Sequence, residues 1–272
     1  MSHDAEHALG PVQSIARAAG VLSVFTPGEP EQTLGVISRR INLPRSTTHR
    51  LLASLIQAGL IERGPTAGTY RLGREAIRIG QVAQIQIRPG DRVYRLLRGL
   101  SLALDETVGL LALVDNEVLV VERVESVLPF RMAYGVGTRL PAYCTASGRV
   151  LLSRWSDQEL DAYLEQVRTS RGAPLSRKAQ AAVREAVCAT RASGYAVDHE
   201  EYAAGLTCLA VPISTPTLGC VAALAISGPT GRMKARLTRP TLTAMQEAAR
   251  AIGQSPELLR ALRHVGADLL GA

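Results

Sequence analysis

The sequence predicts an α+β protein: an N-terminal winged helix-turn-helix joined by a linker helix to a GAF/PAS-like domain with an antiparallel sheet. Three observations predict this class. Residues 14–72 contain short amphipathic helical patterns separated by tight turns and end in a basic hairpin pattern. Residues 73–87 continue as a helical pattern. From residue 91 onward, strand-like runs and amphipathic helical patterns follow one another, which is typical of a sheet with helices packed beside it.

Two short helices are expected at the start of the winged domain. Residues 14–25 and residues 33–40 place apolar side chains at helical spacing, and the second segment carries Arg39 and Arg40 on its outward side. The pair Ile41-Asn42 makes the turn that follows. These two helices are expected to close a small core beneath a third helix.

The third helix, residues 44–57, is the most informative segment of the chain. Pro44 suits the first helical position because its missing N–H costs nothing there, and Gly59 can end the helix in a left-handed conformation. The inward positions are Thr48, Leu51, Leu52, Leu55 and Ile56. The outward positions supply hydroxyl, imidazole and guanidinium donors without an acidic side chain: Arg45, Ser46, His49, Arg50 and Ala53. Such donors can reach base edges in a DNA major groove, so this segment is predicted to be a recognition helix.

A basic hairpin follows the recognition helix. Strand-like residues 60–63 and 69–72 flank a turn that contains glycine and proline, and Arg63 and Arg71 are expected near a sugar–phosphate backbone. The alternative is a small helical domain with a solvated polar face. The order of helix, tight turn, donor-rich helix and basic hairpin favours DNA binding instead. The predicted DNA-binding residues are Arg39, Arg40, Arg45, Ser46, Thr47, His49, Arg50, Arg63 and Arg71.

Composition agrees with an anionic partner. The 272-residue chain carries a net charge of +7 and has a pI near 9.6. Residues 1–74 hold eight arginines against five acids, a balance of +3, so most of the excess lies elsewhere. The sequence contains no apolar run long enough to cross a bilayer, its polar start is not a signal peptide, and its four cysteines form no C-x-x-C pair. A cytoplasmic protein with reduced thiols is expected, with no cofactor and no membrane partner.

The segment after the hairpin is interpreted as a linker and dimerisation helix. It carries its own apolar residues and therefore needs a partner surface, which a second subunit would supply; the alternative is that it folds back on its own domain. We expect domain limits at residues 1–73, 74–90 and 91–272. The last domain is predicted to hold strands at 107–114, 117–124, 130–136, 195–198, 206–213 and 219–227, and helices at 91–104, 145–155, 157–167, 178–193 and 240–263.

Several separated motifs resemble the IclR family of bacterial transcriptional regulators, from Val12 to about Arg263. They are Leu-Pro-Arg-Ser-Thr-Thr-His-Arg-Leu-Leu at 43–52, Tyr-Arg-Leu-Gly at 70–73, Val-Glu-Ser at 124–126, Leu-Pro-Ala-Tyr-Cys-Thr-Ala-Ser-Gly at 140–148, Gly-Tyr-Ala-Val-Asp-His-Glu-Glu-Tyr at 194–202, and Ala-Ile-Ser-Gly-Pro at 225–229. The resemblance implies a winged-helix DNA-binding domain, an effector-binding domain, and a dimer or dimer of dimers on operator DNA. Repression or activation would be tuned by a small metabolite.

The resemblance also implies an effector site. It points to Met132, Ala146, Ser147, Asp198, Cys208 and Ser227, to which we add Tyr143 and Cys144. Independently, residues 144–148 precede a predicted helix, whose free N–H groups favour a carboxylate; the alternative is that Thr145 only caps that helix. Relatives that bind small keto acids tend to have serine where this chain has Ala225. The effector is therefore expected to be a more apolar or aromatic acid.

Two other classes of function were weighed. A cysteine-dependent enzyme would use Cys144 as its nucleophile and His199 as its base, but no third group is identifiable in the sequence. A metal sensor would combine Cys144, Asp198, His199 and Cys208 in a mixed zinc site, although their spacing is not clustered. We therefore expect a non-enzymatic, ligand-responsive regulator that binds DNA as a homo-oligomer.

Overall fold

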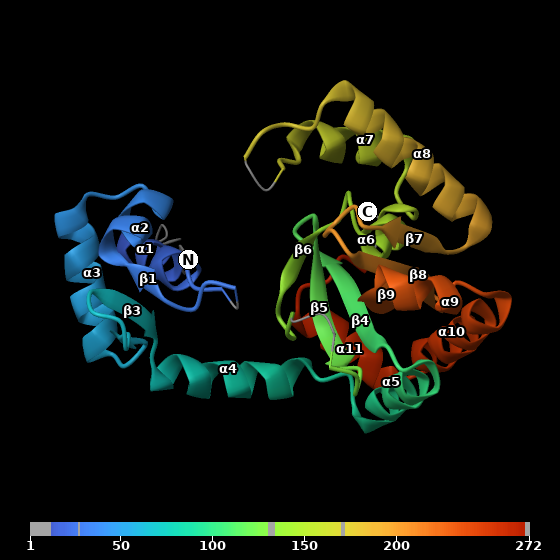
Figure 1. Ribbon diagram of the computed structural model, residues 1–272, viewed down its shortest axis with the longest axis horizontal. Helices are drawn as coiled ribbons and strands as arrows, with labels where there is room; N and C mark the ends of the chain where they lie inside the picture. The colour runs from blue at the N-terminus through green and yellow to red at the C-terminus, as the bar shows by residue number, and fades with distance from the viewer. Residues whose placement is uncertain (1–11, 27, 130–133, 170–171, 270–272) are drawn as a thin grey trace, which may run out of the picture. The chain divides into compact units, whose positions relative to one another are not determined.

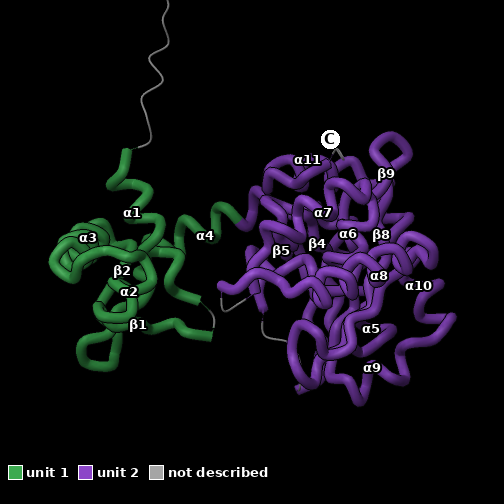
Figure 2. Tube along the Cα trace, turned by 90° about the horizontal axis from the view of Figure 1, so that it is seen from above, with its two compact units in different colours: residues 1–83 green, residues 84–272 purple. Residues whose placement is uncertain are grey.

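The chain forms two compact units, residues 1–83 and residues 84–272 (Figures 1 and 2). Each unit has a hydrophobic core of its own. The computed structural model describes residues 12–26, 28–129, 134–169 and 172–269.

The first unit is a winged helix-turn-helix, as predicted. Its helices are α1 (Gln13–Leu22), α2 (Leu34–Arg40) and α3 (Arg45–Gln57), and its strands are β1 (Gln32–Thr33), β2 (Ile61–Arg63) and β3 (Thr69–Leu72). The strands form an antiparallel sheet in the order β1-β3-β2. The core consists of Val21, Val24, Ile37, Leu52, Leu55, Ile61 and Tyr70.

The ends of α3 differ in one detail from the sequence prediction. Pro44 is the residue before the first helical turn and has an extended backbone (ψ 145°), so the helix begins at Arg45. Thr48 points inward and its hydroxyl donates a hydrogen bond to the Pro44 carbonyl over 3.0 Å. Gly59 follows the helix with φ +71°, which confirms the predicted left-handed residue at that end.

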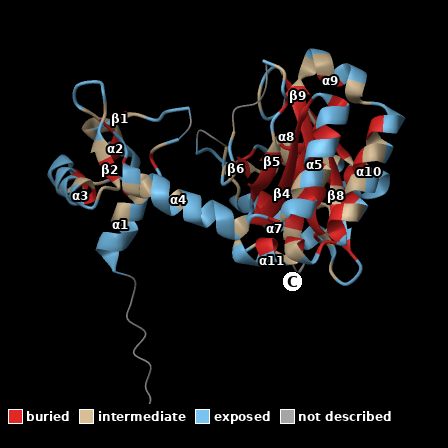
Figure 3. Ribbon diagram, turned by 90° about the horizontal axis from the view of Figure 1, so that it is seen from below, coloured by how far each residue is buried: buried red, intermediate tan, exposed pale blue. Residues whose placement is uncertain are grey.

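Helix α4 (Arg74–Ile87) has no buried residue. Four of its large apolar side chains are exposed, from 46% for Val82 to 71% for Ile85, with Ile77 and Ile79 between them (Figure 3). A helix gains most of its stability in a protein by packing one face against a neighbour, so α4 presents an apolar surface that the described part of the chain leaves uncovered.

The second unit contains a six-stranded antiparallel sheet in the order β6-β5-β4-β9-β8-β7. Its strands are β4 (Thr107–Val114), β5 (Glu117–Val124), β6 (Arg139–Pro141), β7 (Ala196–His199), β8 (Leu206–Thr215) and β9 (Gly219–Pro229). The hairpin predicted at Asp115-Asn116 is confirmed: Val114 pairs with Glu117, and both turn residues have positive φ.

Helices cover both faces of this sheet. Residues of α5 (Asp91–Leu104), α9 (Thr230–Arg236), α10 (Arg239–Gly253) and α11 (Pro256–His264) pack with one face. Residues of α6 (Ala146–Leu152), α7 (Asp157–Gln166) and α8 (Arg177–Ser193) pack with the other. The strands are buried between these two layers (Figure 3).

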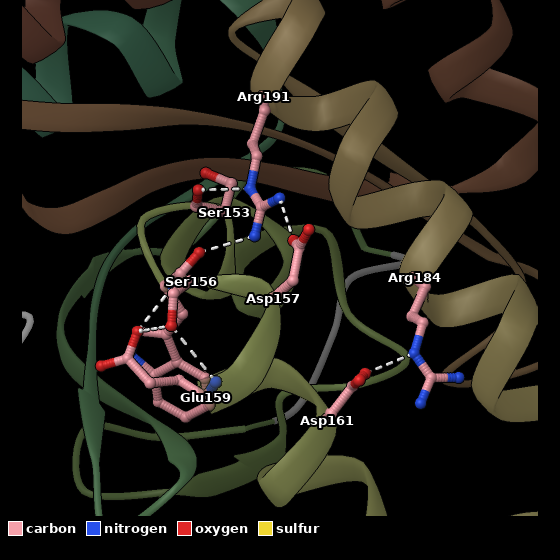
Figure 4. A network of polar contacts seen from close by, with 8 residues as sticks. Ser153, Ser156, Asp157, Glu159, Asp161, Arg184 and Arg191 are labelled. Atoms are coloured by element: carbon pink, nitrogen blue, oxygen red, sulfur yellow. Dashed lines mark hydrogen bonds and ion pairs between the residues drawn. The ribbon is translucent and has the colours of Figure 1, made fainter.

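Polar contacts tie α8 to α7 and to the end of α6 (Figure 4). The Arg191 guanidinium donates hydrogen bonds to the Ser153 and Trp155 carbonyls and pairs with Asp157 over 2.7 Å. Arg184 pairs with Asp161 over 2.5 Å. These contacts hold the layer of helices that covers the α6 face of the sheet.

Two predicted elements of this unit need correction, and two observed elements have no counterpart in the sequence prediction. The single helix predicted at 240–263 is two helices, α10 and α11, because Ser255 is extended and Pro256 starts a new helix. Helix α9 and strand β6 were not predicted. Of the strand predicted at 130–136, residues 130–133, which include Met132, lie outside the described residues, and residues 134–136 are not a strand.

Among the described residues, none of the helices combines the length and apolarity that crossing a bilayer requires.

Candidate DNA-binding surface and effector site

The solvent side of α3 carries the predicted recognition residues. Arg45, Ser46, His49 and Arg50 are exposed and Thr47 is half-buried, whereas Thr48, Leu52 and Leu55 are buried on the inner side. Among the residues that the structure describes, no carboxylate forms a salt bridge with Arg45 or Arg50. The guanidinium of Arg45 lies close to Gly35 of α2, where an added Cβ would come within 3.1 Å of it. This surface therefore offers donors that the protein does not use for an ion pair.

Arg39 and Arg40 of α2 have partners within the protein. Arg40 pairs with Glu29 over 2.5 Å and donates a hydrogen bond to the Val24 carbonyl over 3.2 Å. This hydrogen-bonded pair lowers the pKa of Glu29 below its usual value. Arg39 donates over 3.4 Å to the carbonyl of Gly35 in its own helix. Arg40 is therefore held mainly by its own domain.

The two arginines of the hairpin also have partners. Arg63 donates a hydrogen bond to the Tyr70 hydroxyl over 2.9 Å, with its guanidinium carbon 4.7 Å from the centre of the Tyr70 ring. Arg71 pairs with Glu62 across the hairpin over 2.6 Å. Arg63, Arg71 and Glu62 remain partly or fully open to solvent, so a phosphate could compete for these arginines.

Three predicted effector residues form a row across adjacent strands of the second unit. Asp198 of β7 pairs in register with Cys208 of β8, and Cys208 pairs with Ser227 of β9. Residues that lie directly opposite each other in antiparallel strands point to the same face. Cys208 packs with the layer that contains α6, so the row lies on the α6 face of the sheet.

Asp198 is the most unusual member of the row. It is completely buried; its Oδ1 accepts a hydrogen bond from the Glu201 N–H over 2.8 Å, and its buried Oδ2 accepts none from the described residues. Burial raises the pKa of Asp198 above its usual value. Leaving a buried polar atom unsatisfied is costly, so Oδ2 is available to a group that donates a hydrogen bond.

The cysteines near Asp198 are not activated thiolates. Burial and, to a lesser extent, the nearby Asp198 carboxylate raise the pKa of the Cys144 thiol to about 11. Burial and Asp198 also raise the pKa of the Cys208 thiol. A catalytic cysteine requires the opposite shift, and His199 is exposed. These observations contradict the cysteine-enzyme hypothesis as it was drawn from Cys144 and His199.

The mixed zinc site is not assembled either. Within the part of the chain that the structure describes, no three histidine, cysteine, aspartate or glutamate side chains lie close enough together to hold an ion. Cys144, Cys208 and Asp198 influence one another electrostatically, but His199 lies on the exposed side of β7. The proposed set of four ligands therefore fails for a geometric reason.

Tyr134 belongs to the same region and was not predicted. Its hydroxyl lies 3.3 Å from the Ser227 hydroxyl, and the guanidinium carbon of Arg123 lies 4.8 Å from the centre of its ring. Burial raises the pKa of Tyr134 to about 12, so the phenol stays protonated. The sequence offered a weak signal, because Tyr134 lies two residues after Met132 in the expected strand.

The predicted residues at the start of α6 lie beside this row. Ala146 and Ser147 are buried in its first turn, and Tyr143 and Cys144 are half-buried before it. The Thr145 hydroxyl accepts a hydrogen bond from the Gly148 N–H over 3.2 Å, so it is a helix cap and occupies one of the free N–H groups. Gly148 is required here, because a Cβ would come within 2.0 Å of the Ala142 carbonyl oxygen.

Arg149 connects α6 to β7 behind the row. Its guanidinium donates a hydrogen bond to the Val197 carbonyl over 2.9 Å and pairs with Glu201. Arg149 is buried, whereas Glu201 is exposed. The two ends of the segment that holds Asp198 are thus fixed by one buried cation from the neighbouring helix.

A winged helix with an exposed donor-rich helix, joined to a sheet domain with a buried polar row, defines a DNA-binding transcriptional regulator with a separate sensory domain. A family model described as the C-terminal domain of the bacterial transcriptional regulator IclR matches residues 82–254, and the IclR helix-turn-helix model matches residues 14–65. The chain belongs to the IclR family of bacterial transcriptional regulators.

Individual relatives agree over most of the chain. The HTH-type transcriptional regulator XynR of Escherichia coli is 34% identical over 82% of this chain and 88% of its own. A crystal structure from Rhodococcus sp. RHA1 is 30% identical, covers 92% of this chain and 99% of its own, and superposes with a TM-score of 0.71. An IclR homolog from Microbacterium hydrocarbonoxydans, crystallised with 4-hydroxybenzoate, is 27% identical over 90% of this chain and 99% of its own, with a TM-score of 0.69.

Proposed function

We propose that this protein binds operator DNA as a homo-oligomer and that a small carboxylate metabolite changes its affinity for that DNA. The observation that carries the proposal is the solvent face of α3, where Arg45 and Arg50 form no salt bridge with any described residue. Arginine binds guanine through two parallel hydrogen bonds, so these side chains are suited to base recognition. The proposed DNA contacts are Arg39, Arg40, Arg45, Ser46, Thr47, His49, Arg50, Arg63 and Arg71.

Helix α4 supports the proposed homo-oligomer. Its exposed apolar side chains, Ile77, Ile79, Val82 and Ile85, would be covered by the same helix of a second copy. A dimer, or a dimer of dimers, would present two copies of α3 to a roughly palindromic operator. Their half-sites would lie about 10 base pairs, or a multiple of that, apart.

The proposed effector site surrounds the buried row. Its residues are Tyr134, Tyr143, Cys144, Ala146, Ser147, Asp198, Cys208 and Ser227, with Met132 added by the family resemblance. A relative crystallised with 4-hydroxybenzoate supports an aromatic acid as the class of ligand, and Ala225 replaces a hydroxyl with a methyl group on the strand that carries Ser227. Burial raises the pKa of Asp198, and its Oδ2 accepts no hydrogen bond from the described residues, so the partner that we propose for it is a hydrogen-bond donor of the effector.

The effector can change DNA affinity only if it binds one arrangement of the oligomer better than another. Helix α4 joins the two units and lacks buried anchors of its own, so it is the proposed moving part. A ligand that shifts α4 in both subunits would change the separation of the two recognition helices.

The proposal is tested by a gel shift with the DNA upstream of the protein's own gene, with scrambled competitor and a salt series. We expect a discrete complex that resists competitor for the wild type and for Arg177→Ala, an exposed arginine of α8, and no such complex for Arg45→Ala. Equal, salt-labile binding of all three proteins to both DNAs would contradict the recognition role of α3. Adding 4-hydroxybenzoate to the complex then tests the effector class.

A further inference from the structure

A separate cavity lies on the face of the sheet opposite the Asp198 row. Its volume is about 220 Å³, and it is lined by Tyr195, Val197, Leu209, Leu237, Thr238, Arg239 and Leu242. Val197 directly precedes Asp198 in β7, and Leu209 directly follows Cys208 in β8. Neighbouring residues of a strand point to opposite faces, so this cavity and the proposed effector site share two strands but open on different sides.

Most of the cavity wall is apolar. Val197, Leu209, Leu237 and Leu242 belong to the core formed with α5, α10 and α11, and Leu209 is only 2% exposed. A wall of aliphatic side chains binds an apolar group by excluding water from it. The volume is equivalent to about seven water molecules at roughly 30 Å³ each, which suits a single ring or a short branched chain.

The mouth of the cavity is positively charged. Arg239 is exposed there, and it forms no ion pair with a residue that the structure describes. It is also the first residue of α10, a 15-residue helix whose N-terminus carries partial positive charge. In the first turn of α10, the Thr241 N–H donates a hydrogen bond to the Thr238 hydroxyl, and Pro240 has no N–H group. The N–H of Arg239 is therefore the first-turn donor that remains for a ligand.

The lining contains no acidic side chain that would neutralise this charge. Tyr195 and Thr238 are the other polar residues of the lining, and the remaining lining is aliphatic. We propose that this cavity is a second ligand site, which takes a small organic anion: its apolar body lies against Val197, Leu209 and Leu242, and its carboxylate pairs with Arg239. This site is independent of the proposed effector site, because none of its lining residues belongs to the Asp198 row.

Strand β7 gives the second site a route to the first. The side chain of Val197 lines the cavity, while its carbonyl accepts the hydrogen bond from Arg149 of α6. β7 is the edge strand of the sheet and pairs only with β8 in the described structure. An occupant that displaces Val197 would therefore act on the strand that positions Asp198.

The proposal is tested by ¹⁹F NMR titration of the full-length protein with 4-fluorobenzoate. We expect two saturable binding sites in the wild type, because 4-fluorobenzoate also resembles the aromatic acid proposed for the effector site. Arg239→Gln should weaken one of these two sites at least about tenfold, because a charge-assisted hydrogen bond is lost. Leu242→Trp should also weaken binding by filling the cavity while leaving the guanidinium in place. The neutral analogue 4-fluorobenzyl alcohol should bind the wild type at least about tenfold more weakly than the acid.

Two variants separate this site from other binding. Arg250→Gln removes another exposed arginine of the same helix and should bind 4-fluorobenzoate as the wild type does. Ser227→Ala alters the proposed effector site and should leave binding at the second site intact. The proposal is overturned if the wild type does not bind 4-fluorobenzoate, if Arg239→Gln keeps every site of the wild type at unchanged affinity, or if Ser227→Ala alone abolishes all binding. None of these results bears on the gel shift that tests the proposed function.

Discussion

The recognition helix α3 and the polar row on β7, β8 and β9 are both rich in polar side chains, but they differ in their exposure to water. Arg45, His49 and Arg50 are exposed, whereas Asp198 is completely buried with one oxygen unsatisfied among the described residues. An exposed cation costs the fold almost nothing, while a buried unpaired carboxylate costs it stability. We therefore expect that removing a polar group from α3 changes DNA affinity, whereas removing one from the row changes the stability of the fold.

The largest effect is expected at α3. Arg45→Ala should weaken binding to the operator by about 1–3 kcal/mol, roughly 5- to 150-fold, and relax specificity at one base position, because a bidentate contact to a base is lost. The thermal midpoint should stay close to that of the wild type, since Arg45 has no ion-pair partner among the described residues. Fluorescence anisotropy with operator and scrambled DNA measures the first change, and circular dichroism measures the second. A large fall in Tm would place Arg45 in the fold rather than on the DNA.

The opposite pattern is expected for Asp198→Asn. Burial raises the pKa of Asp198, so the folded protein favours the protonated carboxyl group and loses stability as pH rises through that raised pKa. Asparagine has no proton to lose and keeps an oxygen to accept the Glu201 N–H. The variant should therefore exceed the wild type in Tm at pH 8 by a few degrees, for a relief of about 1–3 kcal/mol.

The pH series is the control for this prediction. The two Tm values should converge as pH falls below the raised pKa of Asp198, where the wild-type carboxyl group is neutral as well. Curves that stay parallel from pH 4 to pH 8 would contradict the burial of an ionisable Asp198. Operator affinity without effector should not differ between the two proteins.

A smaller effect is expected at the hairpin, which lies between these extremes. Arg71 is exposed but already pairs with Glu62. Arg71→Ala should weaken binding to all DNA sequences alike and reduce the slope of log K against log salt by about 0.9, the value for one phosphate contact. Glu62→Gln should strengthen non-specific binding, because it releases Arg71. If Glu62→Gln leaves DNA affinity unchanged at every salt concentration, Arg71 does not contact phosphate.

Among the variants of the DNA-binding unit, the smallest effect on DNA affinity is expected for Arg40→Ala. Arg40 is held by Glu29 and by the Val24 carbonyl, so its removal should lower Tm by about 2 °C and change operator affinity less than Arg45→Ala does. Thermal denaturation and anisotropy on the same preparation provide the comparison. A loss of affinity as large as that of Arg45→Ala, with unchanged Tm, would make Arg40 a principal DNA contact.

Helix α3 and its solvent face could be predicted because the information for them is local. Helical spacing identifies the inward positions of α3, and Gly59 marks its end, so no distant residue is needed to find its solvent face. The partners of the arginines could not be predicted in the same way. Glu29 lies 11 residues before Arg40, and only the folded turn between α1 and α2 brings them together.

The effector region was predicted less completely because its residues come from distant segments. The row of Asp198, Cys208 and Ser227 depends on the register of three strands. The hydroxyl groups of Tyr134 and Ser227 form a hydrogen bond although the two residues are 93 positions apart in the sequence. Spacing within one segment carries no information about such pairs. Short elements were missed for a related reason: β6 has three residues and owes its assignment to pairing with β5. The break before Pro256 was visible in the sequence, since proline cannot continue a helix without losing a hydrogen bond.

Helix α4 has a consequence for the behaviour of the protein at low concentration. A 14-residue helix is close to its helix–coil midpoint in water when nothing packs against it, and α4 has no buried side chain within its own chain. The helical conformation of α4 therefore depends on the surface that packs against it. If that surface is a second copy of the protein, as proposed, the helical fraction of α4 depends on protein concentration. Dilution should melt α4 while both cores stay folded, so the amount of protein in the cell would set how rigidly the DNA-binding unit is connected to its sensor.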